Sequence, residues 1–194
     1  MRYEKGRKDE TRRRIVEVAA DRFRNDGIAA SGLAGIMSEV GLTNGAFYPH
    51  FQSKAELVRE SVAAGMDSQS KLMREIIAAG GIEAAISEYL SPAHRDNPGA
   101  GCTLAALLPE LARQPLETRK IFAERFMSTV RDFVSDLPGQ TEDQEAVAMG
   151  LYAILIGTLQ LARAVEGIDL SDRILAAGAA AARTIVQTAS AEDA

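Results

Sequence analysis

The spacing of apolar residues in this 194-residue chain favours helices almost everywhere, and strand-like alternation is absent. Within residues 9–27, the apolar Ile15, Val18, Ala19 and Phe23 recur at helical intervals and share one face of a helix. Short apolar segments, punctuated by Gly and Pro, continue to about residue 60, and longer Ala-rich segments follow. The sequence therefore predicts an all-α protein of about nine helices.

Composition limits the class of protein to which the chain can belong. Apolar residues make up 46% and charged residues 25%, which is typical of a globular protein. The single cysteine, Cys102, excludes an internal disulfide framework and fits a reducing cytosol. Residues 146–162 carry no charge, but Gly and Ala dilute them, so a buried helix is a better interpretation than a membrane span. No secretory signal is visible in the first thirty residues, so we expect a cytoplasmic protein.

Charge is distributed unevenly along the chain, whose net charge is −5. Residues 1–60 carry 11 Lys and Arg against 9 Asp and Glu, whereas residues 61–194 carry 11 against 18. A polyanionic partner would therefore approach the N-terminal third. By charge alone, a solvated basic tail is the simpler interpretation.

Glycines and capping residues predict where the N-terminal helices begin and end. Gly27 and Gly41 are suited to end the first and second helices, because glycine readily adopts the left-handed conformation that follows a helix C-terminus. Ser31 is a candidate N-cap of the second helix, and Thr43 of the third.

The later boundaries rest on similar signals. Pro49 keeps the third helix short. The capping box Ser53–Glu56 begins a fourth helix that ends near residues 80–81, and the Pro, Gly, Asn and Asp content of residues 91–101 predicts a loop. The other helices are predicted at residues 81–90, 102–114, 115–137, 142–166 and 170–190, with a second capping box at residues 141–144.

Three short helices with a glycine turn between the second and third describe a helix-turn-helix. Gly41 supplies the tight turn. The apolar side chains on either side of it are spaced to form the small core that fixes the angle between the two helices; they are Ile36, Val40, Leu42 and Phe47.

The exposed N-terminal end of the third helix is where a recognition helix places side chains at base edges. Thr43, Asn44 and Ala46 lie there, and Gly45 lets the backbone approach closely. An Asn side chain bonds adenine in a bidentate manner, and Ala or the methyl group of Thr contacts the methyl group of thymine.

These motifs resemble the N-terminal domain of the tetracycline-repressor (TetR) family of bacterial regulators. The resemblance covers about the first 60 residues. It is carried by Ile15, Ala19, Phe23, Gly27, Ile36, Gly41, Gly45, Tyr48, His50, Phe51, Lys54 and Leu57. It implies a DNA-binding domain at residues 1–55 and a helical effector-binding and dimerisation domain at residues 56–194.

The resemblance also implies that Tyr48, His50 and Lys54 hold DNA phosphates, whereas Phe47 and Phe51 belong to the core. Lys54 is expected at the first position of the fourth helix, where its charge and the backbone N–H groups both favour an anion. An isolated His50 would instead be interpreted as a hydrogen-bonded structural residue. The predicted DNA-binding residues are Ser31, Thr43, Asn44, Gly45, Ala46, Tyr48, His50 and Lys54.

The last two predicted helices carry small residues at helical intervals, which lets a second helix approach closely. The resemblance implies that these helices form a four-helix bundle between two subunits, and the alternative is an internal core. A homodimer of this kind would bind an operator of double-stranded DNA with an inverted repeat. The predicted interface residues are Gly150, Ala153, Gly157, Ala164 and Gly178.

An effector pocket in the second domain is a further implication of the resemblance. One Tyr and one Gln among otherwise apolar candidates suit an apolar or weakly polar molecule, which the sequence does not identify. Each candidate is also a plain core residue in the alternative interpretation. The candidate lining residues are Phe122, Phe126, Met127, Met149, Tyr152 and Gln160.

The main alternative is a repressor that senses oxidants or electrophiles through Cys102, which follows a glycine at a helix start. A buried, inert cysteine is the simpler interpretation. His94 and Cys102 offer only two metal ligands, so neither a metal nor another cofactor is expected.

An enzyme is a remote alternative, because the sequence shows no nucleophile–base pair, paired carboxylates or phosphate-binding loop. We therefore predict a dimeric DNA-binding transcriptional repressor of the bacterial cytoplasm, released from its operator by a small ligand.

Overall fold

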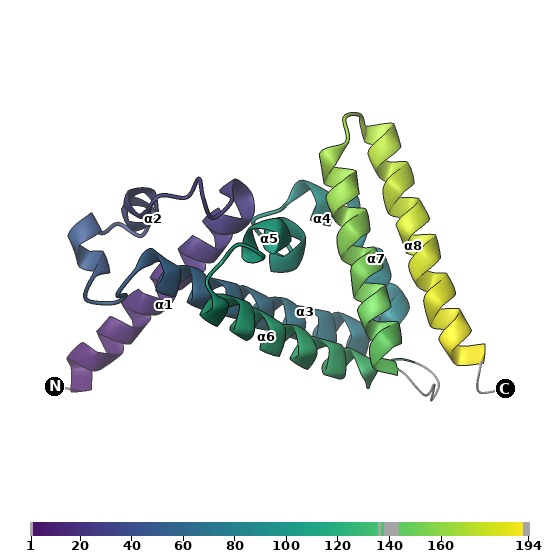
Figure 1. Ribbon diagram of the computed structural model, residues 1–194, viewed down its shortest axis with the longest axis horizontal. Helices are drawn as coiled ribbons and strands as arrows, with labels where there is room; N and C mark the ends of the chain where they lie inside the picture. Colours follow the sequence, from purple (N-terminus) through teal and green to yellow (C-terminus); the bar gives the residue numbers. More distant parts are fainter. Residues whose placement is uncertain (1, 136, 138–143, 192–194) are drawn as a thin grey trace. The chain divides into compact units, whose positions relative to one another are not determined.

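The computed structural model describes residues 2–135, 137 and 144–191, and within these residues it contains helices and no strand (Figure 1). The all-α prediction is confirmed. The elements are α1 (Arg2–Asp26), α2 (Leu33–Glu39), the 3-10 helix η1 (Asn44–Phe47), α3 (Lys54–Tyr89), α4 (Pro92–Asp96), α5 (Thr103–Leu111), α6 (Leu116–Val134), α7 (Gln144–Ala164) and α8 (Ile168–Ala191).

The chain divides into two compact units, and each unit is made of two separate segments of the sequence. The first unit contains residues 1–68 and 102–125, and the second contains residues 69–101 and 126–194. The helices α3 and α6 each contribute residues to both units, and α5 belongs to the first unit with the N-terminal helices.

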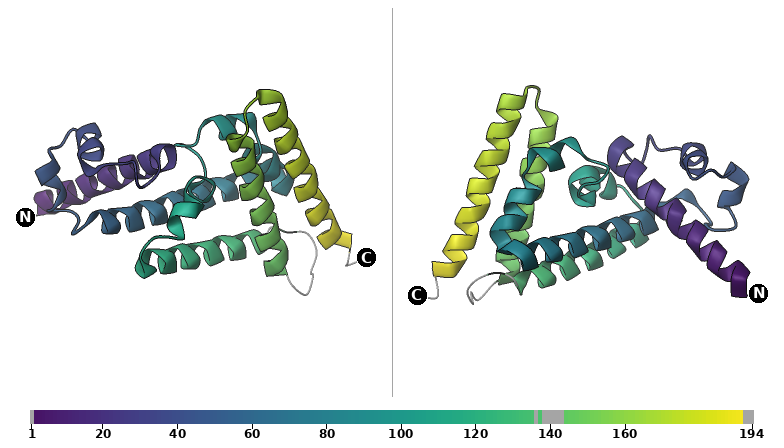
Figure 2. Two further views of the ribbon diagram at one scale, coloured as in Figure 1. Left: turned by 45° about the horizontal axis from the view of Figure 1, so that its top comes forward. Right: turned by 180° about the vertical axis from the view of Figure 1, so that it is seen from behind.

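The core of the first unit forms around α1, which contacts both α2 and α5 (Figures 1 and 2). Ile15, Ala19 and Phe23 are fully buried, as their spacing predicts. Val16 and Ala20 are also buried, and the buried surface of α1 is therefore wider than one stripe. A helix that packs against two others buries more than one face, which the periodicity of a single helix does not indicate.

The turn between α2 and η1 is a Schellman motif centred on Gly41, whose φ is 79°. The N–H of Gly41 donates to the carbonyl of Ser38 at 3.0 Å, and the N–H of Leu42 donates to the carbonyl of Met37 at 2.8 Å. These two bonds satisfy carbonyl groups that the helix end would otherwise leave without a partner. The prediction that Gly41 ends the second helix is confirmed.

The capping predictions for α2 and η1 were less accurate. The N-cap of α2 is Gly32 and not Ser31, and a glycine has no side chain to make a capping bond. Thr43 does occupy the N-cap position of η1, but its side chain makes no capping bond either. The prediction for Ser31 is wrong because its hydroxyl is buried and bonded to backbone carbonyls instead.

The start of α3 has the predicted capping bond from Ser53, but the reciprocal bond of Glu56 goes to the N–H of Gln52 and not to that of Ser53. The N–H of Glu56 donates to Oγ of Ser53 at 3.2 Å, and Oε2 of Glu56 accepts the N–H of Gln52 at 2.7 Å. The helix departs from helical geometry at Gly81, where φ is 70° and ψ is −176°, so the predicted end near residues 80–81 is confirmed as a kink.

Residues 91–101 are not entirely a loop, because they contain α4. Oγ of Ser91 accepts the N–H of His94 at 3.1 Å, and Pro92 follows in the first turn. An N-cap Ser followed by Pro is a common helix start, and the loop-forming composition of the segment concealed it. The predicted capping box at residues 141–144 falls in part outside the described residues.

The helices α7 and α8 form an antiparallel pair in the second unit, joined by a turn at Gly167 with φ of 93° (Figure 1). A Cβ at Gly178 would overlap the side chain of Thr158, so this glycine allows the two helices to approach closely. By length and composition α7 could cross a membrane, a property that it shares with core helices of soluble proteins, and 44% of its apolar window is buried within the protein.

Substitution of Gly41 by Ala is expected to lower the free energy of unfolding by about 1–2 kcal/mol. A Cβ at Gly41 would meet nothing within 4 Å, so the cost arises from the left-handed backbone alone. Gly45→Ala is the matched control, since its Cβ also meets open space and its φ is not positive. Urea unfolding of the two variants measures the difference, and equal stabilities would contradict the backbone explanation.

Candidate nucleic-acid interface

Two buried aromatic rings organise the segment after η1. Phe47 and Phe51 are 0% and 1% exposed, and their rings stack with centroids 5.3 Å apart and planes inclined by 21°. Tyr48 is 66% exposed, and its ring meets that of Phe47 edge to face at 5.5 Å. The predicted division of the aromatic residues into core and surface is confirmed.

The predicted base-contacting residues lie at the N-terminal end of η1. Thr43, Asn44 and Gly45 are exposed, and Ala46 is half-buried. Asn44 is the first residue of η1. Their exposure is consistent with the predicted role, and the contact with bases itself stays a prediction.

His50 lies half-buried among cations. Burial lowers the pKa of its imidazole, and the nearby Lys8 and Arg12 lower it further, which favours the neutral ring. Its Nδ1 is buried and makes no hydrogen bond to the residues that the structure describes. A neutral ring with one nitrogen protonated remains able to donate a hydrogen bond to a phosphate.

Arg12 connects α1 to the start of α3. Its guanidinium donates to the carboxylates of Glu56, at 3.0 Å, and Glu60, and lies 4.3 Å from the ring centroid of Phe51. The side chain of Arg12 is therefore committed to contacts inside the unit. Among residues 6–26 of α1, the exposed cations are Arg7, Lys8, Arg13 and Arg14.

Two of the predicted DNA-binding residues hold the segment 27–32, which joins α1 to α2 and is called the α1–α2 loop below. Ser31 is 0% exposed, and its hydroxyl donates to the carbonyl of Gly27 at 2.7 Å. Nζ of the half-buried Lys54 donates to the carbonyl of Ile28 at 2.6 Å. Ser31 is thus inaccessible to a ligand in this structure, whereas Lys54 has further N–H donors available.

The predicted effector-pocket residues divide between the two units. Phe122 belongs to the first unit and the other five residues to the second. Tyr152 is buried, with its ring meeting those of Phe126 and Phe133 at 6.1 and 5.2 Å. Met127, Met149 and Gln160 are half-buried. The Tyr152 ring belongs to the core of the second unit.

A cleft of about 160 Å³ lies elsewhere in the second unit, where α3, α4 and the residues after α4 meet. Its lining is mostly apolar, with polar groups at Gln69, Glu88 and Asn97. The apolar part of the lining includes Leu72, Met73, Tyr89, Ala93 and Ala100. Sequence reasoning missed this cleft because it assigned residues 91–101 to a loop.

His94 lies in the wall of the cleft and connects α4 to its neighbours. Its Nδ1 lies 2.7 Å from the carbonyl oxygen of Tyr89, and its ring meets the Tyr89 ring edge to face at 4.7 Å. Arg163 of α7 donates to the carbonyls of His94 and Arg95 at 2.6 and 3.0 Å. Burial lowers the pKa of His94, the Tyr89 carbonyl partly offsets this, and Arg163 adds to the lowering.

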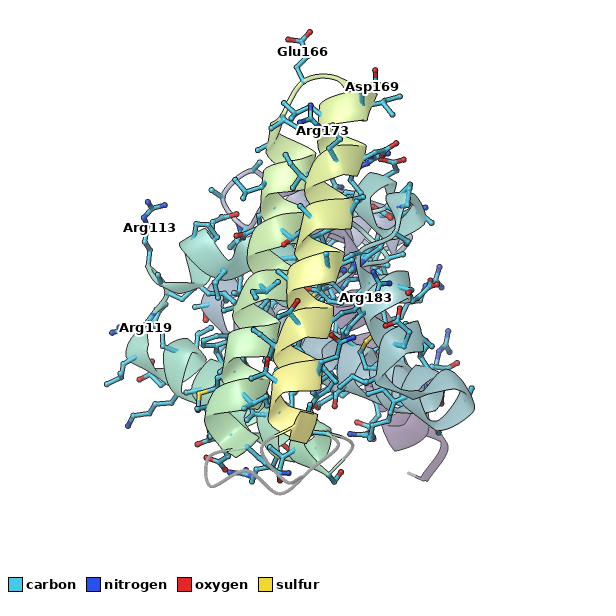
Figure 3. The ribbon with its side chains drawn as sticks, turned by 90° about the vertical axis from the view of Figure 1, so that its right-hand side faces the viewer. Arg113, Arg119, Glu166, Asp169, Arg173 and Arg183 are labelled. Atoms are coloured by element: carbon cyan, nitrogen blue, oxygen red, sulfur yellow. The ribbon has the colours of Figure 1, made fainter. Side chains whose placement is uncertain are left out.

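Four of the five predicted interface residues lie away from the core. Gly150 and Gly157 are half-buried, with open space where a Cβ would be, and Ala153 and Ala164 are exposed. Figure 3 looks onto the two helices and shows Glu166, Asp169 and Arg173 at the end that holds the turn. Gly178, in contrast, is buried against Thr158 and serves the contact between α7 and α8.

Cys102 is the N-cap of α5 and is 3% exposed, so the thiol lies in the interior of the first unit. Among the residues that the structure describes, no group of three or more His, Cys, Asp or Glu is arranged to hold a metal ion.

Comparisons with known proteins agree with this geometry. Residues 15–61 match the model of the bacterial regulatory proteins of the tetR family. A segment of 74 residues is 38% identical to the HTH-type transcriptional regulator TtgR of Pseudomonas putida, and this match covers 38% of the chain and 35% of TtgR. The chain therefore matches about a third of the length of this relative.

Solved structures share the fold over most of the chain. A TetR-family regulator from Cytophaga hutchinsonii superposes with a TM-score of 0.75 at 19% identity, covering 92% of this chain and 96% of that one. The reduced form of Escherichia coli NemR superposes with a TM-score of 0.72 at 17% identity, covering 90% and 96%. Identities this low establish similarity of fold alone.

The free energy of unfolding is expected to fall as the pH is lowered from about 7 to about 5, in part because of His94. The pKa of folded His94 lies below the ordinary value of about 6.5. Between these two pKa values the unfolded chain binds a proton that the folded protein does not. The contribution of His94 to stability is therefore complete above about pH 6.5 and is lost as the pH falls towards the folded pKa of His94.

His94→Asn is the informative variant, because an Asn amide can donate to the same Tyr89 carbonyl but does not titrate. Urea unfolding at several pH values should show a shallower decrease in stability for this variant. A decrease as steep as that of the wild-type protein would assign the effect to other groups.

Proposed function

We propose that the chain is a member of the tetR family of bacterial regulatory proteins, whose model matches residues 15–61, and that it is a dimeric, sequence-specific DNA-binding repressor that a small molecule releases from its operator. The observation that carries the proposal is the exposed N-terminal end of η1, with Asn44 at its first residue. This end lies within the residues that match the family model. The proposal places the protein in the bacterial cytoplasm and assigns no catalytic step to it.

Base recognition would come from η1 and phosphate attraction from its surroundings. The Asn44 amide offers a donor and an acceptor, the pattern that adenine matches in the major groove. The Tyr48 hydroxyl is carried on a ring that rests against buried Phe47, so it is presented to a phosphate at little entropic cost. Exposed cations on α1 supply the attraction to DNA that does not depend on sequence.

A second copy of the chain would pack on the outer face of α7 and α8. Gly150, Gly157 and Ala164 provide a surface of small side chains on α7, and Leu161 in the same region is 60% exposed. On α8, Ala176, Ala177, Ala180 and Ala181 are exposed. Small and apolar side chains that leave this much surface uncovered favour contact with another helix pair.

The effector would bind in the cleft lined by Leu72, Met73 and Tyr89. Its volume of about 160 Å³ is close to that of engineered cavities that hold a benzene-sized molecule. The mostly apolar lining favours an apolar or weakly polar compound about as large as one aromatic ring, with polar groups able to reach Gln69, Glu88 or Asn97.

Selection of duplexes from a random pool by the purified protein tests this function. The expected result is enrichment of an inverted repeat, with half-sites about one helical turn or a small multiple apart. Failure to enrich any sequence would contradict the proposal. Enrichment of a single unrepeated site would retain DNA recognition but contradict the dimeric mode.

Asn44→Ala and Lys54→Ala should weaken binding to the selected duplex in different ways. Asn44→Ala is expected to cost about 1–3 kcal/mol per half-site and to relax the preference at one base position. Lys54→Ala should weaken binding to all sequences and lower the slope of log K against log salt by about one for each subunit. An unchanged slope would mean that the charge of Lys54 serves the Ile28 carbonyl and not a phosphate.

Gly157→Arg is expected to produce folded monomers whose affinity for the inverted repeat is lower by several orders of magnitude. The guanidinium would enter the contact between two copies, while the single chain has open space at this position. Light scattering measures the mass, and circular dichroism checks the helical content. Ala123→Arg is the matched control, since Ala123 is exposed on α6.

A folded Gly157→Arg protein that remains dimeric would place the interface elsewhere. If the variant unfolds, Ala164→Arg repeats the test at an exposed position near the end of α7.

A further inference from the structure

The peptide group between Ile28 and Ala29 is held at both ends by charged side chains from different helices. Nζ of Lys54, at the start of α3, donates to its carbonyl oxygen at 2.6 Å. Oε2 of Glu110, on α5, accepts its N–H at 3.0 Å. Oε1 of Glu110 accepts the preceding N–H, that of Ile28, at 3.1 Å. Hydrogen bonds that involve an ionised group are about twice as strong as neutral ones.

The backbone at Gly27 is shaped to admit this carboxylate. A Cβ at Gly27 would lie 2.7 Å from Oε1 of Glu110, so any larger residue would push the carboxylate away. The φ of Gly27 is 84°, which glycine alone adopts without strain. Gly27 therefore has two functions, because it ends α1 and it leaves space for a side chain that is distant in the sequence.

The α1–α2 loop determines where α2 begins. Its first part is fixed by Glu110 and Lys54, and its last part by the buried Ser31, which bonds to Gly27. Within the first unit, Glu110 is the contribution of α5 to this arrangement. The position of α2, and of η1 packed against it, thus depends on a carboxylate outside the helix-turn-helix.

We propose that Glu110 is a positioning residue for DNA binding, which fixes the α1–α2 loop from α5 together with Lys54. This inference rests on the proposed function. Withdrawal of Glu110 would remove the partners of two N–H groups, one of them on buried Ile28, and would loosen the start of α2. A movement of α5 would in this way change the affinity for DNA without any contact between α5 and the duplex.

Hydrogen exchange tests the arrangement without DNA. In Glu110→Gln the amide nitrogen replaces one acceptor oxygen, so at least one of the two N–H groups loses its partner. The amides of Ile28 and Ala29 are expected to exchange about tenfold faster or more. Glu124→Gln is the matched control, because Glu124 is exposed on α6 and the charge changes equally. Exchange as slow as in this control would overturn the proposal.

Duplex binding tests the functional part, with the duplex that the wild-type protein selects. Glu110→Gln should bind it about tenfold more weakly than Glu124→Gln, because one charged hydrogen bond is removed. The slope of log K against log salt should be the same for both variants, since neither residue contacts a phosphate. Equal affinities of the two variants, or a slope lowered only in Glu110→Gln, would overturn the positioning role.

Two further outcomes can be distinguished, which are failure of the proposed function and unfolding of the Glu110→Gln variant. If the wild-type protein selects no duplex, the proposed function fails and this inference fails with it, whatever the exchange rates are. If Glu110→Gln unfolds, Lys54→Met tests the same peptide group from its carbonyl end. Faster exchange of the Ala29 amide in Lys54→Met would support the arrangement, and unchanged exchange would overturn it.

Discussion

The candidate DNA-binding surface of the first unit depends on the burial of two rings, Phe47 and Phe51, which stack in the core. With both rings held inside, the residues between them have little freedom, so Tyr48 turns outward and His50 remains half-buried. Arg12 lies over the Phe51 ring and bonds to carboxylates of α3. These contacts hold α1 against the same core.

Features that depend on local backbone geometry could be predicted from the sequence. Gly41 ends α2 because a left-handed residue is required there, and Lys54 begins α3 because Ser53 and Glu56 cap that end. Gly81 marks the kink in α3 for the same reason as Gly41. In each case the determining residues lie within a few positions of one another, so a short stretch of sequence contains the whole cause.

Features that depend on distant residues could not be predicted in this way. Ser31 has the side chain of an N-cap, yet burial directs its hydroxyl to the Gly27 carbonyl, and Gly32 begins α2 instead. Glu110 gave no signal in the sequence, because its partners Ile28 and Ala29 are more than eighty positions away. The cleft beside His94 was hidden because α4 lies in a segment rich in loop-forming residues. The type of a side chain indicates that it can form hydrogen bonds, but it does not indicate which distant group is the partner.

The distribution of charge around α3 bears on how the protein would attract DNA. A bare helix N-terminus favours an anion, but the first turn of α3 already contains the carboxylate of Glu56, which accepts the Gln52 N–H. Arg12 is balanced by Glu56 and Glu60, and Lys54 donates to a backbone carbonyl. Exposed cations of the first unit, such as Arg7 and Arg14 on α1 and Arg119 on α6, lie outside this arrangement. Under the proposed function, such exposed cations would contribute attraction to the duplex, while the buried rings and the α1–α2 loop would hold η1 in its orientation.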